Sequence, residues 1–165
     1  GDRIATAWND GHFDHIALWR PDGTLHCEAA EGVGALDLAF SPDGRLLASG
    51  GYDNAATLWR TADCERLNSL PGAGASVPVV AFSADGLTLA AGSNDASGGN
   101  AAVTLWNTRT REPLLQLPMP TATVTATVFG SGNQVLAAAG DHRSVDGPAQ
   151  VRIWRGASIA VARPE

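Results

Sequence analysis

The chain has 165 residues and 44% hydrophobic content, which suits one domain of ordinary size with a packed core. Its net charge of −6 provides no electrostatic attraction to nucleic-acid phosphates or anionic lipid, so we expect neither a nucleic-acid partner nor a membrane partner. Lysine is absent, which excludes a Walker-type phosphate lysine and a Schiff-base lysine.

The two cysteines, Cys27 and Cys64, form no closely spaced pair and no CxxC motif. This favours reduced cysteines in an intracellular, cytoplasmic protein. We expect Cys27 to pack within a strand and Cys64 to lie exposed near a turn. No apolar run is long enough to span a membrane, and the N-terminal residues do not read as a signal peptide.

One pattern recurs along the chain, in which short apolar runs are broken by glycine, proline and aspartate. In chain order its copies are residues 3–19, 40–59, 82–106 and 129–154. The tryptophan that ends each copy recurs at intervals of 40 (19 to 59), 47 (59 to 106) and 48 (106 to 154) residues. A period in the forties is typical of a propeller blade or a helical array. Because the runs are short and no helical stretch of adequate length occurs, the pattern favours the propeller.

The second copy illustrates the predicted blade. Four strands are expected, over roughly 34–40, 45–51, 55–60 and 65–70. The turn at 41–44 reads Ser-Pro-Asp-Gly, in which proline presets φ, aspartate tolerates the next position and glycine closes the turn. One such sheet cannot bury both of its faces, so successive sheets must stack around an axis.

Within residues 40–59 the sequences FSPDG, LASGG-x-D and LW follow one another at a specific spacing. This pattern resembles the WD40-repeat family of β-propellers, and the resemblance covers essentially the whole chain. It implies an all-β fold, a partial WD40-like propeller of about 3.75 four-stranded antiparallel blades. The expected blades are 1–30, which lacks its innermost strand, then 31–72, 73–119 and 120–165.

The resemblance also implies a structural hydrogen-bond network in each blade. A hydroxyl on the second strand, an aspartate in the next turn and the third-strand tryptophan share it with an upstream histidine. The matching residues are Thr6, Asp10 and Trp19; Ser49, Asp53 and Trp59; Asp95 and Trp106; Asp141 and Trp154. Ala91 and Ala137 replace the hydroxyl in the last two copies, while Glu31, Ala73 and Pro120 stand at the expected histidine positions.

The number of blades leaves two arrangements open, because propellers have about four to eight of them. The chain is either a contiguous part of a longer propeller or a small protein that closes its ring with another copy. An unpaired sheet edge and a bare blade face would favour aggregation of an isolated part.

No catalytic signature occurs in the sequence. It contains no HExxH, GxSxG, GxxxxGK[ST] or cysteine-centred nucleophile motif. Residues 72–75 look like a phosphate cradle, but they precede a strand rather than a helix N-terminus, so we read them as an inter-blade loop. We therefore expect no catalytic residue and no cofactor.

The hairpins between second and third strands vary in length and are expected on one face of the propeller, where binding residues collect. Trp8 stands where the other copies have small residues, so it is either a partner anchor or a filler of an incomplete blade. The candidate partner-binding residues are Trp8, His12, Asp14, His15, Asp95, Asn100, His142, Arg143 and Asp146.

The predicted function is a non-enzymatic protein–protein interaction scaffold that binds partners through this loop face and the channel mouth. The alternative is a ligand-binding, metal-binding or enzymatic propeller. It would require His12, Asp14, His15, Asp141, His142 and Asp146 to converge on one pocket. Residues 10–15 hold suitable metal-ligand types, but four ligands so close together on one hairpin would not converge on one ion, so no metal is predicted.

Overall fold

A computed structural model describes residues 2–10, 12, 14–30, 34–72, 74–95, 99–141 and 149–155. Within these ranges the regular structure consists of strands and one short 3-10 turn, η1 (Ser131–Asn133). No helix in them has the length and apolarity needed to cross a membrane. The strands are β1 (Ile4–Asn9), β2 (Asp14–Trp19), β3 (Leu25–Ala30), β4 (Ala35–Phe40), β5 (Leu46–Gly51), β6 (Ala55–Arg60), β7 (Glu65–Pro71), β8 (Ser76–Phe82), β9 (Thr88–Asn94), β10 (Ala102–Asn107), β11 (Pro113–Pro118), β12 (Thr123–Phe129), β13 (Val135–Asp141) and β14 (Gln150–Arg155).

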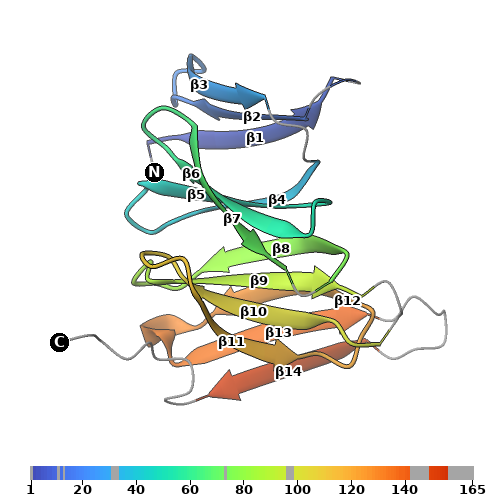
Figure 1. Cartoon of the computed structure of the whole chain (residues 1–165). Coiled ribbons are helices and arrows are strands. Elements are labelled where there is room, and N and C mark those ends of the chain that lie inside the picture. Colours follow the sequence, from blue (N-terminus) through green and yellow to red (C-terminus); the bar gives the residue numbers. More distant parts are fainter. Residues whose placement is uncertain are drawn as a thin grey trace.

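The strands form antiparallel blades that follow the sequence order (Figure 1). Blade one is β1-β2-β3, blade two is β4-β5-β6-β7, blade three is β8-β9-β10-β11, and blade four is β12-β13-β14. One pair, Thr123 with Asn94, joins the last two blades into a continuous sheet. The predicted all-β, partial propeller is confirmed, and the strands expected in the second copy match β4 to β7 to within one residue. Residues 156–165, which would follow β14, lie outside the described ranges.

The Ser-x-Asp-Gly turns join the first and second strands of blades two and three by one mechanism. Ser41 Oγ donates to Asp43 Oδ1 at 2.6 Å and accepts from the backbone N–H of Leu46 at 2.9 Å. Residues 83–88 repeat both bonds at 2.6 and 2.9 Å. Gly44 closes its turn with φ +69, in the left-handed region that favours glycine. The recurring FS-x-DG sequence is therefore a turn signal.

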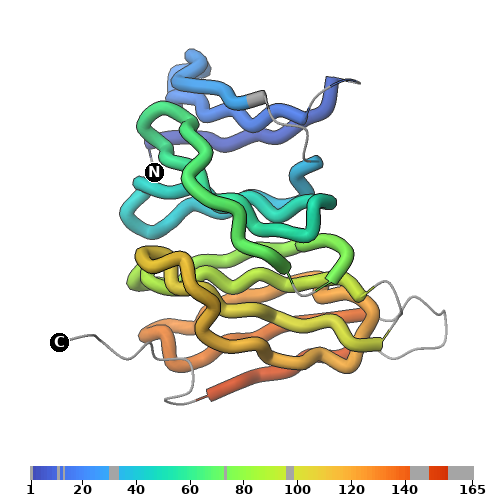
Figure 2. Tube along the Cα trace, in the orientation of Figure 1, coloured from blue at the N-terminus to red at the C-terminus, as the bar shows by residue number. Residues whose placement is uncertain are grey.

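The blades stack side by side, and their innermost strands β4, β8 and β12 lie next to one another in that order (Figure 2). Each blade has an N-side face, turned toward the preceding blade, and a C-side face, turned toward the following one. At the boundary between blades two and three, Leu58 on the C-side face packs in one cluster with Leu89 and Trp106 on the N-side face. The other two boundaries repeat this arrangement, with Leu18 against Leu47 and Trp59, and Leu105 against Leu136 and Trp154.

Two contacts show how tightly blades two and three approach. The backbone N–H of Val80 in β8 donates to Asp37 Oδ2 in β4 at 2.9 Å. At Gly50 in β5, an added Cβ would lie 2.3 Å from the backbone oxygen of Val77 in β8. Glycine is required at position 50 because the neighbouring blade occupies the space of a side chain.

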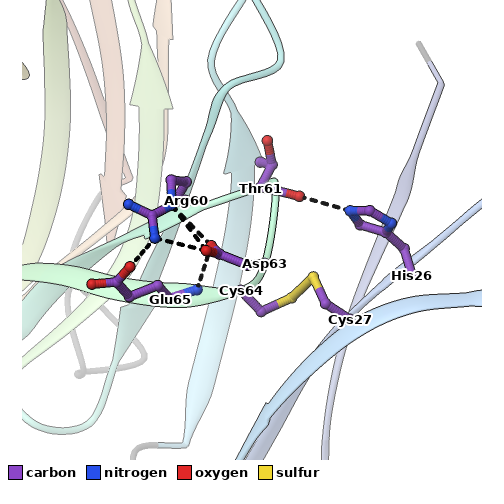
Figure 3. Close-up of polar contacts among 7 residues, drawn as sticks. All are labelled: His26, Cys27, Arg60, Thr61, Asp63, Cys64 and Glu65. Carbon is purple, nitrogen blue, oxygen red and sulfur yellow. Dashed lines mark hydrogen bonds and ion pairs between the residues drawn. A yellow bond between two sulfur atoms is a disulfide. The ribbon is translucent and has the colours of Figure 1, made fainter.

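The expectation of reduced cysteines is wrong. Cys27 in β3 and Cys64 in the turn after β6 form a disulfide between blades one and two, with their Cα atoms 5.7 Å apart (Figure 3). Cys64 is also only 5% exposed, contrary to the prediction of an exposed position. The two residues are 37 positions apart, so the pairing arises from blade stacking and leaves no local spacing signal. The cysteine-based argument for an intracellular, cytoplasmic location falls away, because such bonds persist in oxidising environments.

Polar contacts surround the disulfide (Figure 3). His26 Nε2 lies 3.2 Å from the backbone oxygen of Thr61, which gives a second link between the same two blades. Arg60 pairs with Asp63, with Nη2 2.7 Å from Oδ2, and with Glu65. These ion pairs tie the ends of the turn between β6 and β7, so Cys64 is presented to Cys27 from an ordered segment.

Candidate functional site

The hairpin ends of the second strands lie on one side of the stack, at the right of Figure 1. Among them, the ends of blades one and two carry two exposed aromatic side chains and several carboxylates. We call Trp8, Asp14, His15 and Tyr52 the tip patch.

Trp8 in β1 lies opposite His15 in β2, and their rings stack with centroids 5.0 Å apart and planes 6° apart. The indole remains 40% exposed. Stacking on the facing residue of its own hairpin orients the indole and leaves much of it accessible to a partner, which is the property of an anchor residue.

His15 is held at both ring nitrogens. Its Nδ1 lies 2.8 Å from Glu28 Oε1, and its Nε2 lies 3.1 Å from Asp10 Oδ2. The hydrogen bond to Asp10 raises the pKa of His15 above its ordinary value; partial burial opposes this effect, and Glu28 adds to it. The protonated ring can donate at both nitrogens at once, so it suits a position between two carboxylates.

A pH titration should reveal this arrangement. Because the pKa of His15 is raised in the folded protein, protonation of His15 stabilises the folded state. This contribution is fully present below the unfolded pKa of 6.5 and is lost as the pH rises through the folded pKa. We expect the His15 imidazole signals in NMR spectra to titrate above 6.5, and Asp10→Asn to move the midpoint down. Asp22→Asn, in the turn at the other end of β2, is the control and should leave the midpoint unchanged. A His15 titration insensitive to Asp10→Asn would contradict the assignment.

The other polar residues of this hairpin hold its shape. Asn9 Nδ2 donates to Asp14 Oδ1 at 2.7 Å, and the backbone N–H of His12 donates to Asp10 Oδ1 at 2.8 Å. Asp10, expected in the tryptophan network, bonds to His12 and His15. These contacts fix the direction in which the end of blade one presents Trp8.

Tyr52 is the tip-patch residue that is not among the candidates chosen from the sequence. It is 69% exposed at the tip between β5 and β6. An added Cβ at Gly34 would meet the Tyr52 ring at 2.9 Å and Asp14 Oδ1 at 3.7 Å, so Tyr52 and Asp14 border the same glycine. The sequence offered one sign that Tyr52 could be exposed: it is the only tyrosine of the chain, and it occupies a turn.

The candidate residues of blades three and four are placed as follows. Asp95 Oδ2 accepts from the backbone N–H of Gly99 at 3.1 Å and of Asn100 at 2.8 Å, so it closes its own hairpin. Asp141 ends β13 and is exposed. The sequence candidates His142, Arg143 and Asp146, like Glu31 and Ala73, lie outside the described ranges.

The structure does not bring the described members of the alternative site together. Figure 1 places the hairpin of β1 and β2 at one end of the stack and β13 at the other, with β4 to β11 between them. His12, Asp14 and His15 are thus remote from Asp141. In the described part of the chain, no group of three or more His, Cys, Asp or Glu residues could hold a metal ion.

The tryptophan network is present in part. Trp19 Nε1 donates to Thr6 Oγ1 at 2.8 Å, and Trp59 Nε1 donates to Ser49 Oγ at 2.9 Å. Asp53 instead accepts from the backbone N–H of Ala55 at 3.3 Å. Trp106 is buried, and its Nε1 has no hydrogen-bond partner.

The strand register explains the unsatisfied indole and corrects one residue. Ser49 lies opposite Thr57, two positions before Trp59, and Ala91 lies opposite Thr104, two positions before Trp106. In blade four, Ala138 lies opposite Arg152, two positions before Trp154. The residue that replaces the hydroxyl there is therefore Ala138, and the assignment of Ala137 is wrong by one position.

Restoring the hydroxyl should stabilise blade three. Ala91→Ser is expected to raise the free energy of unfolding by about 1 kcal/mol, because it supplies an acceptor for the buried Trp106 N–H. Ser49→Ala is expected to lower it by about 1–3 kcal/mol, because it leaves the Trp59 N–H unsatisfied. Urea unfolding measures both changes. Ser69→Ala, at an exposed position, is the control and should change the free energy of unfolding by no more than about 0.5 kcal/mol. Equal stabilities of all three variants would show that the indole hydrogen bond contributes nothing.

With this geometry established, the chain falls in the class of β-propellers. Residues 19–60, from the end of β2 to the end of β6, match the family model described as WD domain, G-beta repeat. The chain therefore contains a repeat of the WD40 family, and its fold is that of a partial WD40-like propeller. WD40 propellers in general are non-enzymatic and bind protein partners.

Proposed function

We propose that the chain is a non-enzymatic scaffold that binds protein partners through the tip patch and the neighbouring hairpin ends at the mouth of the channel. The observation that carries this proposal is the pair of exposed aromatic residues, Trp8 at 40% and Tyr52 at 69%, on adjacent rigid blades. Exposed, oriented aromatic side chains are the usual anchors of protein interfaces. Loops on a rigid scaffold are the usual place for them.

The chemistry around these anchors favours a partner segment with cationic side chains. Asp10, Asp14 and Glu28 lie around the Trp8–His15 pair, and an indole face attracts guanidinium and ammonium groups. Binding should therefore weaken as the salt concentration rises.

A photo-crosslinking experiment tests the proposal. The photoreactive amino acid p-benzoylphenylalanine is placed at position 8 or 52, or at position 87 as a matched control. Leu87 lies in the turn before β9, on the opposite side of the stack, and is 37% exposed. In an extract of the source cells we expect the same discrete adduct from positions 8 and 52, and none from position 87.

Competition with unlabelled chain distinguishes a specific partner from nonspecific crosslinking. Excess unlabelled wild-type chain should abolish the adduct, whereas excess chain carrying both Trp8→Ala and Tyr52→Ala should not. No adduct at positions 8 and 52, or an equal pattern from position 87, would contradict the tip patch as the binding surface.

We also propose that each of the two end blades packs against a further blade. The N-side face of blade one and the C-side face of blade four have no covering blade among the described residues. Further blades of a longer propeller, or another copy of the chain that closes the ring, would cover them.

A further inference from the structure

The Cys27–Cys64 disulfide crosses a boundary between blades and lies apart from the strand pairing within either blade (Figure 3). On one side of it, β3 is paired with β2. On the other side, β6 is paired with both β5 and β7. Opening of the bond therefore leaves the antiparallel ladder of each blade in place and removes only a link between the two blades.

The turn that carries Cys64 has the same shape in blade three, where no cysteine occurs. Cys64 has φ +59, in the left-handed region, and its backbone N–H donates to the backbone oxygen of Arg60 at 2.9 Å. Arg111 holds the equivalent position, with φ +66 and its N–H bonded to the backbone oxygen of Asn107 at 2.8 Å. Since this turn forms without a disulfide, a reduced Cys64 should stay directed toward β3 and able to bond again.

The two cysteines differ in their access to solvent. Cys64 is 5% exposed, whereas Cys27 is only half-buried, in the outer strand of blade one. Thiol–disulfide exchange requires that the attacking thiolate reach one of the two sulfur atoms. Cys27 is therefore the residue at which a thiol can open the bond while the chain remains folded.

The boundary that the disulfide crosses also sets the relative positions of the two aromatic residues of the tip patch. Trp8 belongs to blade one, and Tyr52 belongs to blade two. Apolar packing of Leu18 with Leu47 joins the same blades, but such packing is non-directional. A covalent link restricts the movement of one blade on the other, so it lowers the entropic cost of placing both aromatic residues on one partner.

We propose that the Cys27–Cys64 disulfide is a reversible redox switch for partner binding. The oxidised bond holds Trp8 and Tyr52 in a fixed relative position, and reduction by a small cellular thiol such as glutathione releases blade one from this constraint. The inference rests on the proposed function of the tip patch, whose regulation it supplies.

The exchange proceeds in two balanced steps. A glutathione thiolate attacks the Sγ atom of Cys27, a bond forms between these two sulfur atoms, and Cys64 leaves as a thiolate that takes up a proton. A second glutathione thiolate then attacks the glutathione sulfur of the mixed disulfide. This step releases the Cys27 thiolate, which is protonated in turn, together with oxidised glutathione, so the two thiols have supplied two electrons.

Tyr52 permits a test that needs no partner, because it is the only tyrosine of the chain. Incorporation of meta-fluorotyrosine gives a single fluorine NMR signal from the tip between β5 and β6, whereas Cys64 lies in the turn at the other end of β6. We expect this signal to move when dithiothreitol reduces the chain and to return on reoxidation. In a chain carrying both Cys27→Ala and Cys64→Ala, the control, the signal should match that of the reduced wild type and ignore dithiothreitol.

Two results of this experiment would overturn the switch. One is a Tyr52 signal that reduction leaves unchanged, because the bond would then have no influence on the tip patch. The other is a reduced chain that has lost its far-UV circular dichroism spectrum, because a switch requires two folded states.

Photo-crosslinking measures the effect on binding. The chains labelled at position 8 or 52 are reduced and desalted under argon, or left oxidised, and are added to an extract freed of small thiols by desalting. We expect reduction to lower the adduct yield at least about tenfold, because the two anchors are no longer preorganised, and reoxidation to restore it. An equal yield from oxidised and reduced chains would contradict the switch. Absence of an adduct from the oxidised chains would contradict the scaffold proposal instead, so the two proposals fail on different measurements.

Mass spectrometry tests the direction of the exchange. The folded oxidised chain is treated with reduced glutathione, quenched with acid and digested. We expect glutathione on Cys27 and a free thiol at Cys64. Glutathione mainly on Cys64, or no exchange until denaturant unfolds the chain, would overturn the proposed route.

Discussion

Reduction of the Cys27–Cys64 disulfide is expected to lower the free energy of unfolding by about 4 kcal/mol. The bond closes a segment of 37 residues, and the chain-entropy relation assigns this magnitude to a loop of that length. The local fold increases the importance of the bond, because blade one has three strands among the described residues and blade two has four. The disulfide and the His26–Thr61 hydrogen bond both link its outer strand β3 to blade two.

Denaturant unfolding with and without dithiothreitol measures this effect. A chain carrying both Cys27→Ala and Cys64→Ala is the control. Its free energy of unfolding should equal that of the reduced wild type and should not change when dithiothreitol is added. Hydrogen exchange would locate the change, with faster exchange expected in β1 to β3 than in β8 to β11. Identical midpoints for the oxidised and reduced wild type would contradict a stabilising bond.

Gly50→Ala is expected to cost about 3 kcal/mol, the second large effect. The new Cβ would lie 2.3 Å from the backbone oxygen of Val77, and backbone cannot turn aside as a flexible side chain can. Relief requires β5 and β8 to separate, which would also stretch the packing of Leu58 on Leu89 at the same boundary.

Gly99→Ala is the matched substitution, because nothing lies within 4 Å of an added Cβ at that position. It should change the stability by no more than about 0.5 kcal/mol. Urea unfolding of both variants separates the steric effect from the general cost of replacing glycine. Equal stabilities of Gly50→Ala and Gly99→Ala would show that the blades can move apart freely.

The sequence predicted those parts of the fold that each blade encodes within itself. The strands of blade two and the turn at 41–44 depend on residues only a few positions apart, and the turn signal recurs at 83–86 in blade three. The hydroxyl–indole pairs were expected because the WD40 resemblance implies them, and the structure forms them at Thr6–Trp19 and Ser49–Trp59.

Features that depend on the contact between blades were not visible in the sequence. Cys27 and Cys64 meet only because blade one stacks on blade two, and Tyr52 borders Asp14 for the same reason. The assignment of Ala137 to the hydroxyl position failed for a different reason. Residues 137–139 are all alanine, so an alignment of the repeats cannot tell them apart, and the pairing of Ala138 with Arg152 identifies the equivalent position. His15 was selected as a binding candidate, whereas its bonds to Asp10 and Glu28 became apparent from the hairpin geometry.

The bond between Cys27 and Cys64 also determines how the chain would carry a mechanical load. A pulling force applied at the two ends crosses from β3 directly to the turn after β6 through the sulfur atoms, so the intervening residues bear no tension. With 37 positions bypassed, the fully stretched oxidised chain would be shorter than the reduced chain by about 120 Å, at about 3.4 Å per residue. The strands β4 and β5, which form the inner half of blade two, lie within this bypassed segment. Their residues would therefore not be extended by the force while the disulfide is intact.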